Sequence, residues 1–217
     1  MNELDSTPSD DSADDELRQA LAAAFGAQDD GAGLELRAEA YDDERAAWRL
    51  RDVPDGVPLL GVNPGAAFGA TKVYPPARIA AAVERVRAAR DVFPVLLCGP
   101  GEEGLAQAVG AALEGPYLSV ADDVPDLGEL KALLGRLTVL ATTDTGPRHM
   151  AEALGVPTVV WMGPTDPRWS GHSEATVVRK EDLECLACHQ KTCPIGLPCM
   201  EELPPERVAE ALRARLP

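Results

Sequence analysis

Lys72 and the turn Asp144–Gly146 have the residue types and spacing that best suit chemistry on an anionic ligand. Pro147 follows this turn and suits the first turn of a helix, where its missing N–H costs nothing. The free N–H groups of a helix N-terminus attract anions, and a glycine lets a ligand approach the backbone closely. Asp144 can accept hydrogen bonds from hydroxyl groups, and a lysine ammonium can neutralise an anion. We therefore predict a site for an anionic, hydroxyl-rich ligand.

Each candidate residue also has a purely structural interpretation. On position alone, Lys72 is equally an ordinary surface lysine, and Asp144 is a common helix-capping residue. His149, one turn into the same helix, is by type more often a packing residue than an acid or base. Glu102 begins a helix after a glycine-rich turn, where a carboxylate is favoured electrostatically in any case. Glu103 is the alternative to Glu102, since the register of that turn is open.

A second cluster contains four cysteines within fifteen residues, in the pattern Cys185-x2-Cys188-x4-Cys193-x5-Cys199, with His189 inside it. Four thiolates could hold zinc at a structural site or, as a weaker interpretation, an iron–sulfur cluster. Disulfides and free thiols carry the same weight as metal on this spacing. Bound metal or disulfide bonds would each crosslink the loop before the final helix, so we predict a structural role for the cluster.

Short apolar segments alternate with helical ones from Leu59 onward. This alternation predicts βαβ units, and hence a parallel sheet with right-handed crossovers. We expect a doubly wound, Rossmann-like α/β domain over residues 58–217, with strands at 59–63, 95–98, 117–120, 137–141, 158–162 and 176–178.

In such sheets ligands bind at the carboxyl ends of the strands, where the strand order reverses. Four turns follow strands at that edge, so we expect them to converge on one crevice: residues 63–72, 99–103, 142–147 and 163–168. Thr165 and Asp166 in the last turn would shape the floor of the crevice, although a Gly-Pro-Thr-Asp-Pro turn also has a purely structural interpretation.

The first part of the chain differs in composition. The protein has 217 residues and a formal net charge of −16, and residues 1–60 carry 16 acidic but only five basic side chains. We predict an acidic, largely irregular extension and linker over residues 1–57, partly disordered, with short helices near 15–25 and 41–50 that lack a wide apolar face. The acidity argues against nucleic acid as a partner. The sequence shows no membrane-spanning run and no signal peptide, which favours a cytoplasmic protein.

Four motifs in order resemble those of the lipopolysaccharide heptosyltransferases, glycosyltransferase family 9. Residues 63–69 and 71–75, Asn-Pro-Gly-Ala-Ala-Phe-Gly and Thr-Lys-Val-Tyr-Pro, resemble the Pro-Gly-Ala…Lys-x-Trp-Pro segment of that family. Later family motifs are matched by residues 99–103, 144–149 and 163–167. The resemblance covers about residues 59–215, and Tyr74 stands where the family usually has tryptophan.

The resemblance implies half of a GT-B fold, the C-terminal domain that binds the nucleotide-activated heptose. The acceptor site and the catalytic base would then belong to an N-terminal domain that this chain lacks. Lys72 would contact the diphosphate and stabilise the leaving group. The donor-binding residues implied by the matched motifs are Lys72, Thr71, Glu102, Asp144, Thr145, Gly146 and His149.

The resemblance implies an inverting glycosyltransferase that takes an ADP-heptose-like donor, acts on a lipopolysaccharide core or similar glycan, and needs no metal for catalysis. It would work in the cytoplasm, at the inner face of the membrane. One alternative is a catalytically incomplete donor-binding module or half-enzyme that needs a separate N-terminal domain. Another is a metal-clipped structural or regulatory protein with a vestigial sugar site.

Overall fold

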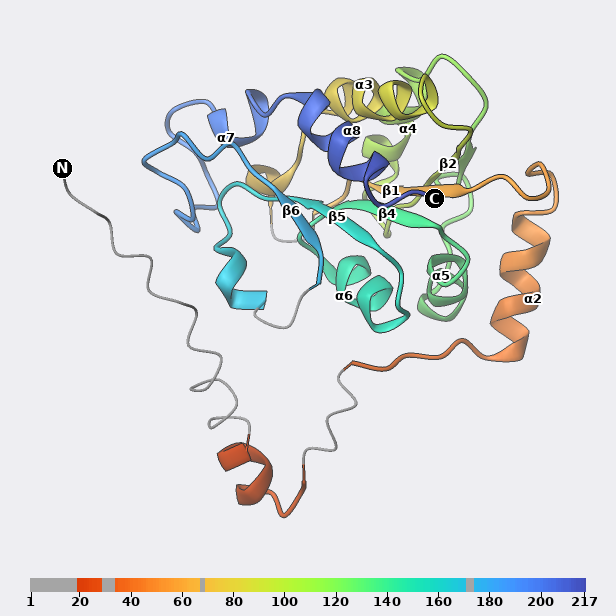
Figure 1. Ribbon diagram of the computed structural model, residues 1–217, viewed down its shortest axis with the longest axis horizontal. Coiled ribbons are helices and arrows are strands. Elements are labelled where there is room, and N and C mark those ends of the chain that lie inside the picture. The colour runs from red at the N-terminus through yellow and green to blue at the C-terminus, as the bar shows by residue number, and fades with distance from the viewer. Residues whose placement is uncertain (1–18, 29–33, 67–68, 171–173) are drawn as a thin grey trace. The chain divides into compact units, whose positions relative to one another are not determined.

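Within the described residues, six parallel strands form one sheet in the order β3-β2-β1-β4-β5-β6 in a computed structural model of the protein (Figure 1). The structure describes residues 19–28, 34–66, 69–170 and 174–217. The strands are β1 (Leu59–Asn63), β2 (Phe93–Leu96), β3 (Leu118–Ser119), β4 (Val139–Thr143), β5 (Thr158–Trp161) and β6 (Thr176–Val178).

Helices cover both faces of this sheet. On one face, α3 packs against α4 and α8, and on the other α5 packs against α6 (Figure 1). These helices are α3 (Pro76–Arg87), α4 (Glu103–Ala111), α5 (Leu127–Leu134), α6 (Gly146–Ala153) and α8 (Pro205–Arg213). A further helix, α2 (Ala40–Arg49), packs against α5, and α7 (Pro198–Glu201) precedes α8. Two short 3₁₀ turns are η1 (Ala70–Lys72) and η2 (Pro167–Ser170).

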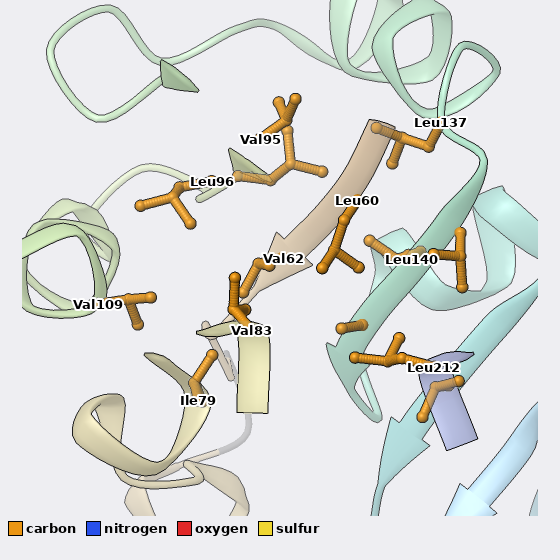
Figure 2. Close-up of a cluster of buried hydrophobic side chains, with 14 of the residues drawn as sticks. Leu60, Val62, Ile79, Val83, Val95, Leu96, Val109, Leu137, Leu140 and Leu212 are labelled. Atoms are coloured by element: carbon orange, nitrogen blue, oxygen red, sulfur yellow. The ribbon is translucent and has the colours of Figure 1, made fainter. Parts of the chain in front are cut away.

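The core lies between the sheet and its helices. Figure 2 shows side chains of the central strands, such as Leu60 and Val62, gathered with Ile79 and Val83 of α3 and Val109 of α4. When a strand is covered on both faces, its sequence is a short continuous run of apolar residues and does not alternate between apolar and polar ones. This is the pattern from which the sequence predicted a parallel sheet.

The strand order makes β1 and β4 the switch point of the fold. The chain runs outward from β1 through β2 to β3, returns to β4 beside β1, and then runs outward the other way. The doubly wound, Rossmann-like fold class is therefore confirmed, and the carboxyl ends of β1 and β4 meet where such folds bind ligands.

The boundaries of β4 differ from the expected 137–141. The strand is Val139–Thr143, so Thr142 and Thr143 end the strand and are fully buried. The ladder explains the shift, because Thr142 is in register with Asn63 of β1 and Thr143 with Trp161 of β5. Polar residue type suggested a turn at these positions, but pairing on both sides extends the strand.

The chain divides into two compact units, Met1–Glu35 and Leu36–Pro217. In the first unit residues 19–24 are helical, while residues 1–18 of the predicted acidic extension lie outside the described residues. The second unit includes residues 36–57, which the composition assigned to the extension. It does so because α2 is fixed to α5 through Glu129, which accepts hydrogen bonds from Arg45 and Arg49, each at 2.7 Å.

Candidate functional site

The turns that follow β1 and β4 are linked by side-chain hydrogen bonds at the switch point. The Asn63 amide donates to the hydroxyl of Thr142 at 3.0 Å and to that of Thr145 at 3.2 Å. The Thr143 hydroxyl donates to the Gly65 carbonyl. These bonds hold the two turns together at the carboxyl ends of β1 and β4, the place where the sequence predicts a ligand crevice.

Lys72 reaches across this crevice from η1. Its ammonium donates to Asp144 Oδ2 at 2.8 Å and to the Asp144 carbonyl at 3.2 Å. The Lys72 side chain is only 13% exposed. The sequence also allowed Lys72 to be an ordinary surface lysine. The geometry instead places its ammonium beside Asp144.

Asp144 does not cap the helix that follows it. Thr145 is the N-cap residue of α6, and the Asp144 carboxylate points to two cations instead. Its Oδ2 contacts Lys72, and its Oδ1 accepts a hydrogen bond from Arg148 Nη1 at 2.7 Å. Burial raises the pKa of Asp144, but hydrogen bonds and charge from Lys72 and then Arg148 outweigh burial and hold the pKa below its usual value.

Arg148 is a residue that the sequence interpretation missed. It is 1% exposed and also donates from Nε to Glu152 Oε1 at 2.9 Å. The signal was the i, i+4 spacing of Asp144, Arg148 and Glu152, which places the three on one side of a helical turn.

The N-terminus of α6 opens beside this ion pair. A Cβ added at Gly146 would meet nothing within 4 Å, so the protein itself leaves the space over this residue open. The N–H groups of the first turn of α6 lie at its N-terminal end, where an anion is favoured. His149 is exposed on the same helix, so it is not a packed core residue.

Glu102 lies on the β2 side of the crevice. Its carboxylate accepts a hydrogen bond from the Gly99 N–H at 3.1 Å and fills the space where a side chain at Gly65 would stand. Glu103, the alternative, instead accepts a hydrogen bond from the Gly101 N–H at an exposed position. The contact with Gly65 brings Glu102, and not Glu103, beside the turn that follows β1.

Thr71 is next to Lys72, but its hydroxyl serves the cysteine segment, residues 185–199. The Thr71 hydroxyl donates to the Gln190 carbonyl at 2.8 Å and is buried. The same segment is anchored to the turn after β5, because His189 donates its N–H to the Pro164 carbonyl at 2.8 Å. The segment therefore joins two turns of the crevice. The contact of Thr71 with a donor stays a prediction.

The turn after β5 has a clear structural role. Asp166 accepts hydrogen bonds from the N–H and the guanidinium of Arg168, and these lower the pKa of Asp166 to about 2. Thr165 is buried. Trp169, in η2, is 74% exposed and stacks on His189 with ring centroids 3.9 Å apart.

The cysteines are free thiols, so the structure holds no disulfide among them. Cys199 is buried, and burial, followed by the neighbouring thiols of Cys188, Cys185 and Cys193, raises its pKa to about 11. Over the described residues, no three His, Cys, Asp or Glu side chains are placed to hold a metal ion. The predicted structural zinc at Cys185, Cys188, Cys193 and Cys199 therefore gains no support from the geometry.

A pocket of about 720 Å³ lies at the opposite ends of the strands. It is lined by residues at the amino ends of β1, β2 and β3, among them Val57, Phe93 and Leu118. The groups suited to an anionic ligand gather instead at the carboxyl ends, where Lys72, Asp144 and the α6 N-terminus lie together with Glu102 to one side. We place the candidate site there because ligand chemistry, not volume, identifies it.

Known proteins of one family resemble this chain. The sequence model of glycosyltransferase family 9 (heptosyltransferase) matches residues 15–197. Lipooligosaccharide heptosyltransferase 2 of Campylobacter jejuni is 29% identical over 164 residues, which are 72% of this chain and 50% of that protein. Lipopolysaccharide heptosyltransferase 1 of Pseudomonas aeruginosa is 30% identical over 191 residues, 77% of this chain and 51% of that protein.

Solved structures show the same fold. E. coli ADP-heptose LPS heptosyltransferase II has a TM-score of 0.67 at 22% identity, covering 83% of this chain and 53% of that one. The family 9 glycosyltransferase of Veillonella parvula has a TM-score of 0.68 at 24% identity, covering 84% and 53%. The chain thus spans about half the length of the relatives that it matches. Among the described helices, none is long and apolar enough to cross a membrane.

Proposed function

Because the chain belongs to glycosyltransferase family 9, the heptosyltransferase family, we propose that it binds a nucleoside-diphosphate heptose in the crevice between β1 and β4. We propose that the bound heptose is transferred to a lipopolysaccharide core or a similar glycan. An ADP-heptose-like donor is the best candidate, since a solved E. coli relative is an ADP-heptose LPS heptosyltransferase.

The observation that carries this proposal is the pairing of Lys72 with Asp144 beside the N-terminus of α6. A lysine ammonium, helix N–H groups and the open space over Gly146 together suit a diphosphate. The carboxylate of Asp144 suits the hydroxyl groups of a sugar. Glu102, on the β2 side of the same crevice, would then contact the nucleoside, while Thr145 and His149 would line the donor site.

The proposed transfer is a direct displacement at the anomeric carbon with inversion. An acceptor hydroxyl oxygen forms a bond to the anomeric carbon as the bond from that carbon to the diphosphate oxygen breaks. The nucleoside diphosphate leaves with the electron pair, and the acceptor proton passes to a base. Lys72 and the α6 N–H groups would stabilise the charge on the leaving group, so the diphosphate needs no metal ion in this scheme.

The base that takes the acceptor proton is not among the residues of this crevice named above. We propose that this base, like the acceptor site, belongs to a domain that corresponds to the half of the relatives that this chain does not match. We also propose that the reaction takes place in the cytoplasm, at the inner face of the membrane.

Calorimetry tests the donor site directly. We expect ADP-heptose and ADP to bind, and EDTA to leave both affinities unchanged. Lys72→Ala should weaken both ligands about 10- to 100-fold, the value of one or two charge-assisted hydrogen bonds.

Lys131→Ala, which removes a lysine from α5, is the matched control and should bind like the wild type. Failure of the wild type to bind ADP-heptose would contradict the proposed function.

A further inference from the structure

Arg148 is a buried cation that the proposed displacement does not use. Its guanidinium lies between two carboxylates, Asp144 at 2.7 Å and Glu152 at 2.9 Å. All three side chains are at most 11% exposed. A buried charge is strongly unfavourable unless it is paired, so these contacts hold Arg148 in place.

Lys72 is held differently, although it contacts the same carboxylate. It comes from η1, outside the helix that carries Arg148, and its point charge sits on a flexible four-carbon stem. Because the stem is flexible, a phosphate at the α6 N-terminus can compete with the Asp144 carboxylate for the Lys72 ammonium. Arg148 contacts Glu152 on its own helix and Asp144 just before that helix, and moving it would disturb both pairs.

Lys72 and Arg148 can therefore have different roles at Asp144. When Lys72 turns to a diphosphate, Asp144 would keep one of its two cations. We propose that Arg148 is a positioning residue, which holds the Asp144 carboxylate in its place for the sugar hydroxyls while Lys72 binds the diphosphate. This inference rests on the proposed function, because it needs a ligand with both a diphosphate and a sugar.

The electrostatics of Asp144 agree with this division. Burial disfavours the ionised carboxylate, and the groups that oppose burial are Lys72 from η1 and Arg148 from α6. Glu152 also contacts that guanidinium, on the side away from Asp144. With both cations removed, burial would shift Asp144 toward its protonated form, which accepts fewer hydrogen bonds from a sugar.

Calorimetry with ADP and with ADP-heptose separates the two parts of the ligand. In Arg148→Gln we expect ADP to bind within about twofold of wild type, while the added affinity that the heptose contributes falls about tenfold or more. Arg148→Lys, which keeps the charge, should restore part of the heptose contribution. Arg49→Gln removes a comparable arginine–carboxylate pair on α2 and should change neither affinity.

Three results decide the matter. Equal losses for ADP and ADP-heptose in a folded Arg148→Gln protein, or no loss for either, would overturn the positioning role and leave the proposed function standing. Absence of binding by the wild type would end both proposals. Thermal unfolding of each variant shows whether it is folded.

Arg148→Lys covers the case in which Arg148→Gln does not fold. Because lysine keeps the charge but lacks the planar fork of donors that contacts both Asp144 and Glu152, we expect ADP to bind within about twofold of wild type and the heptose contribution to be smaller than in the wild type. Equal losses for ADP and ADP-heptose in a folded Arg148→Lys protein would overturn the inference.

Discussion

At the scale of single residues, Asp144 shows what its sequence position could and could not predict. Its place before a helix allowed either capping or ligand binding, and only the structure shows that Thr145 takes the N-cap position. Lys72 was predicted from its motif. Arg148 was missed because an arginine in the first turns of a helix is usually solvated, and nothing in its type announces burial.

Gly146 gives the first prediction at this scale. Because a Cβ at this residue meets nothing in the protein, we expect Gly146→Ala to fold at least as stably as the wild type. The methyl group would occupy space where the diphosphate approaches the backbone, so donor affinity should fall. Urea unfolding and calorimetry measure the two effects.

Gly135→Ala is the control for Gly146→Ala, because Gly135 also accepts a Cβ at ordinary contact distances and lies at the end of α5. Unchanged donor affinity in Gly146→Ala would remove the argument from open space.

Tyr74 carries a pH prediction. Burial raises its pKa to about 12, and its hydroxyl donates to the Leu203 carbonyl at 2.8 Å. The unfolded chain releases this proton near pH 10, whereas the folded protein keeps it until about pH 12, so stability falls as the pH rises through this window. Tyr74→Phe should be less stable by about 1 kcal/mol near neutral pH.

The stability gap between wild type and Tyr74→Phe should narrow above about pH 10, since phenylalanine has no proton to release. Urea midpoints measured at neutral and at alkaline pH check this. A gap that stays constant would contradict the assigned role of burial.

At the scale of elements, α2 shows how a helix without a wide apolar face can still pack against a domain. Its apolar face is narrow, so the sequence suggested a linker, yet Arg45 and Arg49 fix it to the buried Glu129 of α5. Hydrophobic periodicity does not reveal a helix that docks through ion pairs. The strands were easier to predict, because continuous apolar runs separated by helical segments are typical of a buried parallel sheet.

Glu129 therefore carries the prediction for this helix pair. Glu129→Gln leaves two arginines without their buried carboxylate, and we expect it to lower the free energy of unfolding by about 3 kcal/mol. Trypsin should then cut at Arg49 faster than in the wild type, as α2 detaches.

Glu206→Gln removes an exposed, solvent-screened pair with Arg85 and should change stability little, so it serves as the control. Equal stabilities of the Glu129 and Glu206 variants would show that the ion pairs do not hold α2.

At the scale of the whole molecule, alternation of strands and helices predicted the fold class and the meeting of turns at the carboxyl edge. It could not predict that the cysteine segment spans two of those turns, because that contact depends on backbone groups such as the Gln190 and Pro164 carbonyls. Hydrogen bonds of backbone groups leave no trace in residue type.

Thiol reactivity tests the state of the cysteine segment. Exposed Cys185 and Cys188 should react rapidly with a thiol reagent, whereas buried Cys98 and Cys199, whose pKa values burial raises to about 11, should react only on unfolding. Protection of Cys185 and Cys188 that a chelator or a reductant removes would reinstate the metal or the disulfide interpretation.

Trp169, which stacks on His189, is an intrinsic fluorophore of the molecule. Of its three tryptophans, Trp161 is buried in the core, Trp48 lies on α2, and Trp169 lies in η2, after β5, where it is exposed and stacks on His189 of the cysteine segment. With Trp48 replaced by phenylalanine, a change in the emission of the exposed indole on ligand binding would report on the turn that follows β5. The course of ligand entry could then be followed in real time, without attaching a dye.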